Sequence, residues 1–225
     1  MIKIRRGIFE TNSSSVHAIA IVKSKQALNS YYYDEYCDHK VGDYFCKGNS
    51  LVIKPGCFGW ENKRLVSPEE KASYLMTTAM LLDRFDEFRE KLSTWFKEKN
   101  IKFRFKDTPE ELKFDDPNDE RYNLEYYILL HKKYDNDKNK VFSEEELKRE
   151  QLNDLCFENN IFIDHFNEDN ANEDLLNYVL ESSNNLFSYL FNWNSYVWTG
   201  NDNSEDMPNV DLIDKRKAKC FVKGN

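Results

Sequence analysis

The sequence predicts an α+β fold: a small antiparallel sheet that includes an N-terminal hairpin, packed by several helices. Two observations lead to this class. The first quarter of the chain holds short segments rich in Ile and Val, whereas residues 67–99 carry apolar residues at helical spacing. With 225 residues, 40% of them hydrophobic, the chain is long enough for one sizeable core. We therefore expect a single domain over residues 1–225, with a candidate sub-division near 107–120.

The N-terminal strands come first in the chain. Residues 2–9 (IKIRRGIF) and 15–22 (SVHAIAIV) have the composition of strands, and a polar turn separates them. Residues 50–56 (SLVIKPG) predict a third strand, which stops at a proline and a glycine. These three segments are expected to form the small sheet, with the first two paired as the hairpin.

The helix expected over residues 67–99 has the clearest start signal. Ser67 suits the N-cap and Pro68 the first helical position, while Glu69 and Glu70 complement the helix dipole. Apolar residues then follow at spacings of three and four: Leu75, Ala79, Leu82, Phe85, Phe88, Leu92 and Trp95. This spacing predicts one helix whose apolar face packs on the sheet.

The second half of the chain is mainly helical in pattern. The expected elements are a strand at 101–105, helices at about 122–134, 143–157 and 171–191, and a last strand at 194–198. An acidic, turn-rich loop follows the last strand. No internal repeat at solenoid period is present.

The charge balance argues against direct nucleic-acid binding. Lys and Arg number 32 against 40 Asp and Glu, a formal net charge of -8, so the molecule as a whole repels phosphate backbones. Two basic runs, at residues 2–6 and 214–219, lie near opposite ends of the chain. They form one basic face only if the fold brings those ends together.

The sequence predicts a cytoplasmic protein, in the host cell if it is phage-encoded, with no membrane contact. No apolar stretch approaches the about 20 residues that a membrane span needs, and the N-terminus turns polar before a signal-peptide core develops. The five cysteines are odd in number and widely spread, which favours reduced thiols over a disulfide framework.

Two stretches resemble metal sites, and no cofactor is expected. The group Cys37, His39, Cys46 and Cys57 lacks the ligand spacing of structural zinc sites. Residues 135–146 resemble a calcium loop, with Asp135, Asp137, Asn139, Ser143 and Glu146 at ligand positions. Lys140, however, stands where such a loop needs glycine for a sharp turn. The preferred interpretation is a solvated connection between helices.

Residues 10–17 (ETNSSSVH) allow a catalytic and a structural interpretation. If the chain is an enzyme, Ser15 is the nucleophile and His17 its base, with Glu10 and a folded-in Asp202 or Glu61 completing the site. However, no G-x-S-x-G elbow surrounds the serines. The preferred interpretation is a tight turn held by hydrogen bonds from side chains to the backbone.

Three segments carry a resemblance to a known group. RRGIFETNSSSVH at residues 5–17, CFGWE at 57–61 and TGNDN at 199–203 resemble segments of uncharacterised proteins from phages and mobile elements of low-GC bacteria. The resemblance implies an origin and brings no activity with it. Cys57 stands where that group is expected to have an acidic residue.

Aromatic residues give the clearest interface pattern. Tyr31, Tyr32 and Tyr33, with Tyr36 close by, cannot all face inward on a regular element, and tyrosines are enriched at protein interfaces. Trp60 is either an exposed aromatic platform or, more in keeping with such rings, part of the core.

Two function classes follow from these patterns. The preferred one is a non-enzymatic phage or mobile-element accessory protein that binds and inhibits a host macromolecule. Its expected partner is a host protein or protein–RNA complex, such as a nucleic-acid-handling defence complex, and its action would then be anti-CRISPR-like. The alternative is a small hydrolase or transferase with a site around residues 10–17. The first is preferred because no constellation in the sequence meets the geometry of an active site.

Overall fold

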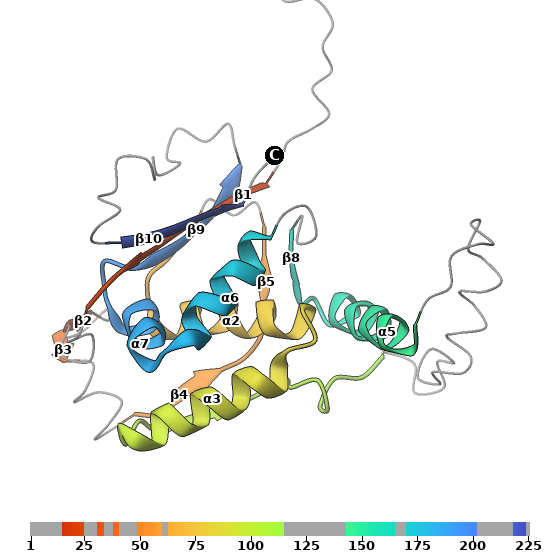
Figure 1. Ribbon diagram of the computed structural model, residues 1–225, viewed down its shortest axis with the longest axis horizontal. Helices are drawn as coiled ribbons and strands as arrows, with labels where there is room; N and C mark the ends of the chain where they lie inside the picture. Colours follow the sequence, from red (N-terminus) through yellow and green to blue (C-terminus); the bar gives the residue numbers. More distant parts are fainter. Residues whose placement is uncertain are drawn as a thin grey trace, which may run out of the picture.

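The computed structural model describes residues 15–24, 31–33, 38–40, 49–59, 63–114, 143–164, 170–201 and 218–223. Within these ranges it confirms the α+β class, with helices packed against a small four-stranded antiparallel sheet (Figure 1). The helices are α2 (Pro68–Leu81), α3 (Phe85–Glu98), α5 (Glu144–Glu158), α6 (Ala171–Glu181) and α7 (Ser183–Phe191).

The main sheet has the strand order β10-β1-β9-β6, and every neighbouring pair is antiparallel. Its strands are β1 (Ser15–Val22), β6 (Lys63–Leu65), β9 (Tyr196–Asn201) and β10 (Ala218–Lys223). The remaining described strands form three two-stranded pairs: β2 (Tyr31–Tyr33) with β3 (Asp38–Lys40), β4 (Leu51–Ile53) with β7 (Phe103–Phe105), and β5 (Cys57–Phe58) with β8 (Phe162–Ile163).

The expected N-terminal strand lies inside the main sheet. β1 pairs with β10 on one edge, where His17 lies opposite Lys223, and with β9 on the other, where Ser15 lies opposite Asn201. Both partners come from the C-terminal part of the chain. Residues 2–9, the first arm of the expected hairpin, are outside the described residues.

The helices cover one face of the main sheet. In Figure 1, α2, α6 and α7 lie on the same side of β1, β9 and β10, and α3 packs beyond α2. Ile19 and Ile21 of β1 and Val197 of β9 join this core. Ala18, Ala20, Tyr196 and Trp198 form a second buried cluster. Because side chains alternate along a strand, this cluster belongs to the opposite face of the sheet.

The prediction of a single helix over residues 67–99 is wrong, because the structure has two helices there, α2 and α3. α2 begins at the Ser67 N-cap with a complete capping box to Glu70, as the sequence predicts, but ends at Leu82. Asp83 then adopts a positive φ of 55°, a left-handed conformation that Asp tolerates better than most residues and that ends helices. The apolar face is nevertheless confirmed, because Phe88 and Leu92 are fully buried.

The long helix expected at 171–191 is also divided. Ser182 is extended, with φ -154° and ψ 152°, and its side chain accepts a hydrogen bond from the Asn185 backbone as the N-cap of α7. The helix predicted at 143–157 is confirmed as α5, with Ser143 as its N-cap. The helix predicted at 122–134 lies outside the described residues.

The predicted strands at 50–56, 101–105 and 194–198 are confirmed as β4, β7 and β9. The expected place of residues 50–56 in the N-terminal antiparallel sheet is wrong, because β4 pairs in parallel with β7 in a separate two-stranded sheet. The sequence does not predict β10, whose first two residues belong to the basic run at 214–219. In the ranges that the structure covers, no helix has the length and hydropathy to cross a membrane.

Candidate functional site at one end of the main sheet

Three sequence segments singled out above approach one end of the main sheet. β1 starts at Ser15, opposite Asn201, so the segments at 5–17 and 199–203 meet there. Lys63 lies opposite Thr199 on the other side of β9, which brings the chain just after residues 57–61 to the same end. Segments more than a hundred residues apart in sequence therefore border one site.

His17 is the central side chain of this site. It has no exposed surface, and its Nδ1 lies 2.9 Å from the Tyr74 hydroxyl oxygen of α2. The Tyr74 hydroxyl in turn donates to Asn172 Oδ1 of α6 at 2.8 Å. The Phe58 ring packs edge-on against Tyr74, with ring centroids 5.1 Å apart. β1, α2 and α6 thus contribute one residue each to a buried series of hydrogen bonds.

The direction of these hydrogen bonds fixes the tautomer of His17. A tyrosine hydroxyl has a single proton, and here it is donated to the Asn172 carbonyl oxygen. The same hydroxyl oxygen must therefore accept from His17, so Nδ1 carries the ring proton. In the neutral ring, Nε2 then has the lone pair. This is the tautomer that a general base uses, with its other nitrogen held by an orienting group.

The side-chain amide nitrogen of Asn172 is a donor that this series of hydrogen bonds does not use. This Nδ2 atom is buried and has no hydrogen-bond partner among the residues that the structure describes, and the residue is only 1% exposed. An unpaired buried amide donor destabilises a fold by about 1 to 3 kcal/mol. It also offers a bond to a ligand oxygen next to Tyr74.

Lys71, three residues before Tyr74 in α2, is a second buried polar group. Its Nζ donates to the backbone oxygens of Asn192 at 3.0 Å and Ser195 at 3.1 Å, which ties the α7–β9 connection to α2. Burial lowers the pKa of Lys71 to about 7, although the charge of Glu70 opposes this shift. The sequence interpretation missed Lys71. Its position four residues before Leu75, on the apolar face, was the available signal.

A cavity of about 300 Å³ lies between the start of α2 and β4, β5 and β6, next to this site. Phe58 and Leu65 contribute apolar walls, and Lys63 and Glu70 form an ion pair of 2.9 Å at its edge. Burial raises the pKa of Glu70, but hydrogen bonds and charge from Lys63 and hydrogen bonds from Ser67 outweigh it and lower the pKa. Glu70 therefore stays ionised at neutral pH.

The predicted site residues fall into three groups. Glu10, Glu61, Asp202, Tyr36, Trp60, Asp135, Asp137, Asn139 and Lys140 lie outside the described residues. Ser15 is described as the first residue of β1, and Tyr31, Tyr32 and Tyr33 as β2, through their backbones. His17 and Glu146 are described with their side chains.

The described residues contain no group of three or more His, Cys, Asp or Glu placed to hold a metal ion. Of the four residues in the candidate zinc group, Cys57 is exposed on β5, and His39 is in β3. Cys37 and Cys46 are outside the part of the chain described.

We predict that calcium does not bind at residues 135–146 with micromolar affinity. Glu146 Oε2 accepts hydrogen bonds from Ser143 N at 2.7 Å and Ser143 Oγ at 2.9 Å, so the last ligand position is held in a capping box. Lys140 also replaces the turn glycine. Isothermal titration with calcium should give no saturable heat. A micromolar site that disappears in Glu146→Gln would contradict this prediction.

Comparisons of the chain with protein-family models, with curated proteins and with solved structures find no match.

Proposed function

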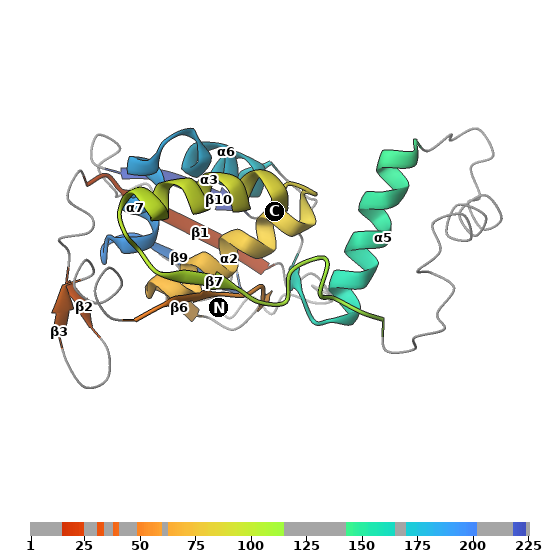
Figure 2. The ribbon, with the colours of Figure 1, turned by 90° about the horizontal axis from the view of Figure 1, so that it is seen from below.

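We propose that this protein is a phage or mobile-element accessory protein that binds and inhibits a host macromolecule. The observation that carries the proposal is the tyrosine strand. Tyr31–Tyr33 form β2, whose described pairing is with β3 in a two-stranded sheet separate from the main one. Figures 1 and 2 show this pair at the periphery of the molecule.

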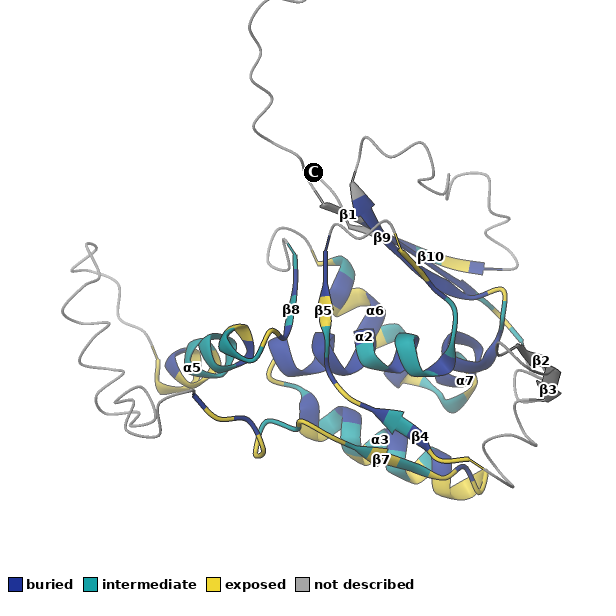
Figure 3. Ribbon diagram, turned by 180° about the vertical axis from the view of Figure 1, so that it is seen from behind, coloured by how far each residue is buried: buried dark blue, intermediate teal, exposed yellow. Residues whose placement is uncertain are grey.

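The acidic surface indicates the kind of target. The net charge of -8 is complementary to a basic groove that normally holds nucleic acid. The first turn of α5 contributes to this charge, because it carries three consecutive exposed glutamates (Figure 3), and the Glu144 side chain is 66% exposed. The target is a host protein or protein–RNA complex, and a nucleic-acid-handling defence complex fits this chemistry. Inhibition would then be anti-CRISPR-like.

Tyr32→Ala and Tyr33→Ala should each weaken target binding by about 2 kcal/mol, or roughly 30-fold, as truncation of an interface tyrosine does. The target is first identified by affinity capture from host lysate with mass spectrometry, and each affinity is then measured by titration. Phe157→Ala is the matched control. Phe157 is 69% exposed on α5, which lies at the opposite end of the molecule from β2 (Figure 2). A loss of affinity in Phe157→Ala alone would refute the tyrosine interface.

The second candidate function is a small hydrolase or transferase. It is favoured by the convergence of the three segments on His17 and by the tautomer that leaves Nε2 as the proton acceptor. In this function His17 takes a proton from a hydroxyl group of the serine run or of a substrate, and Tyr74 and Asn172 hold the ring in place. The binding function and the enzymatic function predict opposite effects for serine-to-alanine substitutions in this run.

For the binding function, Ser13→Ala, Ser14→Ala and Ser15→Ala should each leave target affinity unchanged. Each should lower the free energy of unfolding by about 0.5 to 2 kcal/mol at most, the range for lost turn and cap bonds. Affinity and melting temperature are measured on the same proteins. A stable Ser15→Ala protein that is fully inactive would instead support the enzyme. His17→Ala and the double variant should then be equally inactive, since residues that act as a unit are not additive.

A further inference from the structure

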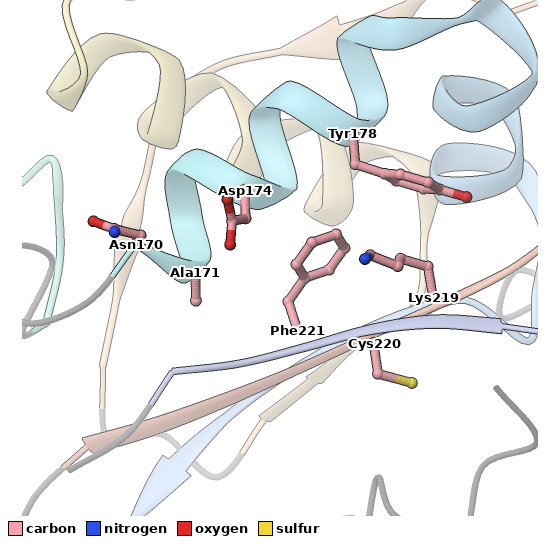
Figure 4. Close-up of a pocket in the computed structure, with 7 residues that line it drawn as sticks. All are labelled: Asn170, Ala171, Asp174, Tyr178, Lys219, Cys220 and Phe221. Carbon is pink, nitrogen blue, oxygen red and sulfur yellow. The ribbon is translucent and has the colours of Figure 1, made fainter.

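A groove runs between α6 and β10 on the side of the sheet away from β9. Figure 4 shows Asp174 and Tyr178 reaching from α6 toward Phe221 and Lys219 of β10. These side chains border a cavity of about 450 Å³. β10 is the outermost strand that the structure describes on this side of the sheet. The groove therefore combines a strand edge with a helix wall, the geometry that accepts one more extended segment.

The walls of the groove have a definite chemistry. The Tyr178 and Phe221 rings lie 5.8 Å apart between their centroids and form an aromatic floor. Lys219 is already placed over the Phe221 ring, with its Nζ 5.4 Å from the centroid. Asp174, in the first turn of α6, adds an exposed carboxylate to the lining. An apolar segment that also carries positive charge is the best match for these walls.

We propose that residues 2–9 of this chain lie in the groove as a fifth strand along β10. β1 follows these residues after a linker of five residues, 10–14, and β10 and β9 already occupy both of its edges. The outer edge of β10 is two strand spacings from β1, about 10 Å, and five extended residues span up to about 17 Å. The outer edge of β6 is one spacing farther and only three residues long.

The composition of residues 2–9 fits the groove. Ile2, Ile4 and Ile8 fall on one face of a strand and can fill the aromatic cavity. Arg6 lies on the same face as these isoleucines, so its positive charge is directed to the side of the acidic start of α6, whereas Lys3 and Arg5 project to the other face of the sheet. The short linker also gives this segment an effective concentration on the order of millimolar, which favours it over an external peptide.

The direction of the fifth strand follows from the connection. Residues 2–9 must end at the Ser15 end of β1, so they run antiparallel to β1 and parallel to β10. The turn at residues 10–14 then lies at the same end of the sheet as Asn201 and His17. This docking is independent of which proposed function is correct.

NMR on the full chain tests the proposal directly. The wild-type protein should show cross-strand nuclear Overhauser effects between residues 2–9 and 218–223, in parallel register. Ile4→Pro removes a strand donor and should accelerate hydrogen exchange of the outward-facing β10 amides at least 10-fold, whereas exchange between β6 and β9 stays unchanged. Ile4→Val, the matched control, should exchange like wild type.

Two results would overturn this docking. One is a wild-type protein that shows no contacts between the two segments while its β10 amides exchange at the same rate as in Ile4→Pro. The other is protection of β10 that falls on dilution, because a second copy of the chain would then be the occupant.

Discussion

The free energy of unfolding should rise by about 5 kcal/mol between pH 7 and pH 10.5 through Lys71 alone. Lys71 is fully buried, and burial lowers its pKa from 10.5 in the unfolded chain to about 7 in the folded protein. Between these two values the unfolded chain holds the proton and the folded protein does not, so stability increases with pH. Below pH 7 both states are protonated, and the folded protein bears the full penalty of a buried ammonium group.

The hydrogen bonds of Lys71 persist through this titration. A neutral amine retains two N–H groups, one each for the carbonyl oxygens of Asn192 and Ser195. The Tyr189 hydroxyl, which donates to the Lys71 backbone oxygen at 2.9 Å, stays protonated because burial raises its pKa well above 10. Over this pH range Lys71 loses one proton, and the Tyr189 hydroxyl beside it keeps its own.

Urea unfolding across the pH range measures the effect, and Lys71→Met should remove this rise. Lys91→Met is the matched control, because Lys91 also donates to a backbone oxygen, that of Leu180, but its side chain is 40% exposed. It should keep the wild-type dependence on pH. A Lys71→Met protein with the same slope as wild type would show that Lys71 is charged throughout.

Tyr74→Phe should lower the free energy of unfolding by about 2 to 4 kcal/mol, because it leaves two buried polar groups without their partner. These groups are His17 Nδ1 and Asn172 Oδ1, each hydrogen-bonded to the Tyr74 hydroxyl. The phenylalanine ring keeps the edge-on contact with Phe58, so the loss isolates the hydroxyl.

Tyr189→Phe is the control for Tyr74→Phe. Both tyrosines have no exposed surface, but the Tyr189 hydroxyl makes one bond, to the Lys71 backbone oxygen, which also accepts a bond within α2. The expected loss is about 1 kcal/mol. Chemical unfolding of both variants measures the difference. Equal losses would mean that the chain through His17 and Asn172 contributes no more than a single bond.

The starts of α2 and α5 and the strand character of β1 could be predicted from the sequence. Ser67 and Ser143 cap α2 and α5 through bonds to residues three positions later, so a few neighbouring residues contain the whole signal. The Ile and Val of β1 are likewise local. A capping box or a strand composition acts over one turn or a few residues and needs no distant contact.

The ends of helices were set by tertiary packing. The apolar spacing continues through Leu82 and Phe85, yet the chain reverses at Asp83. The reversal lets Phe85 and Phe88 pack on Phe105 of β7, with ring centroids 5.6 and 5.9 Å apart. Such a contact depends on a strand about 20 residues away.

The candidate site could be predicted from the sequence only in part. Sequence reasoning selected His17, but its partners Tyr74 and Asn172 lie 57 and 155 residues farther along the chain. The sequence alone determined that the segments of β1, β4, β7 and β9 form strands and where α2 and α5 begin, because those signals are local. Only the tertiary structure decided that β1 lies between β9 and β10, that Lys71 is buried, and that His17 bonds to Tyr74. Pairing and burial depend on which distant surfaces meet, and no local pattern encodes that choice.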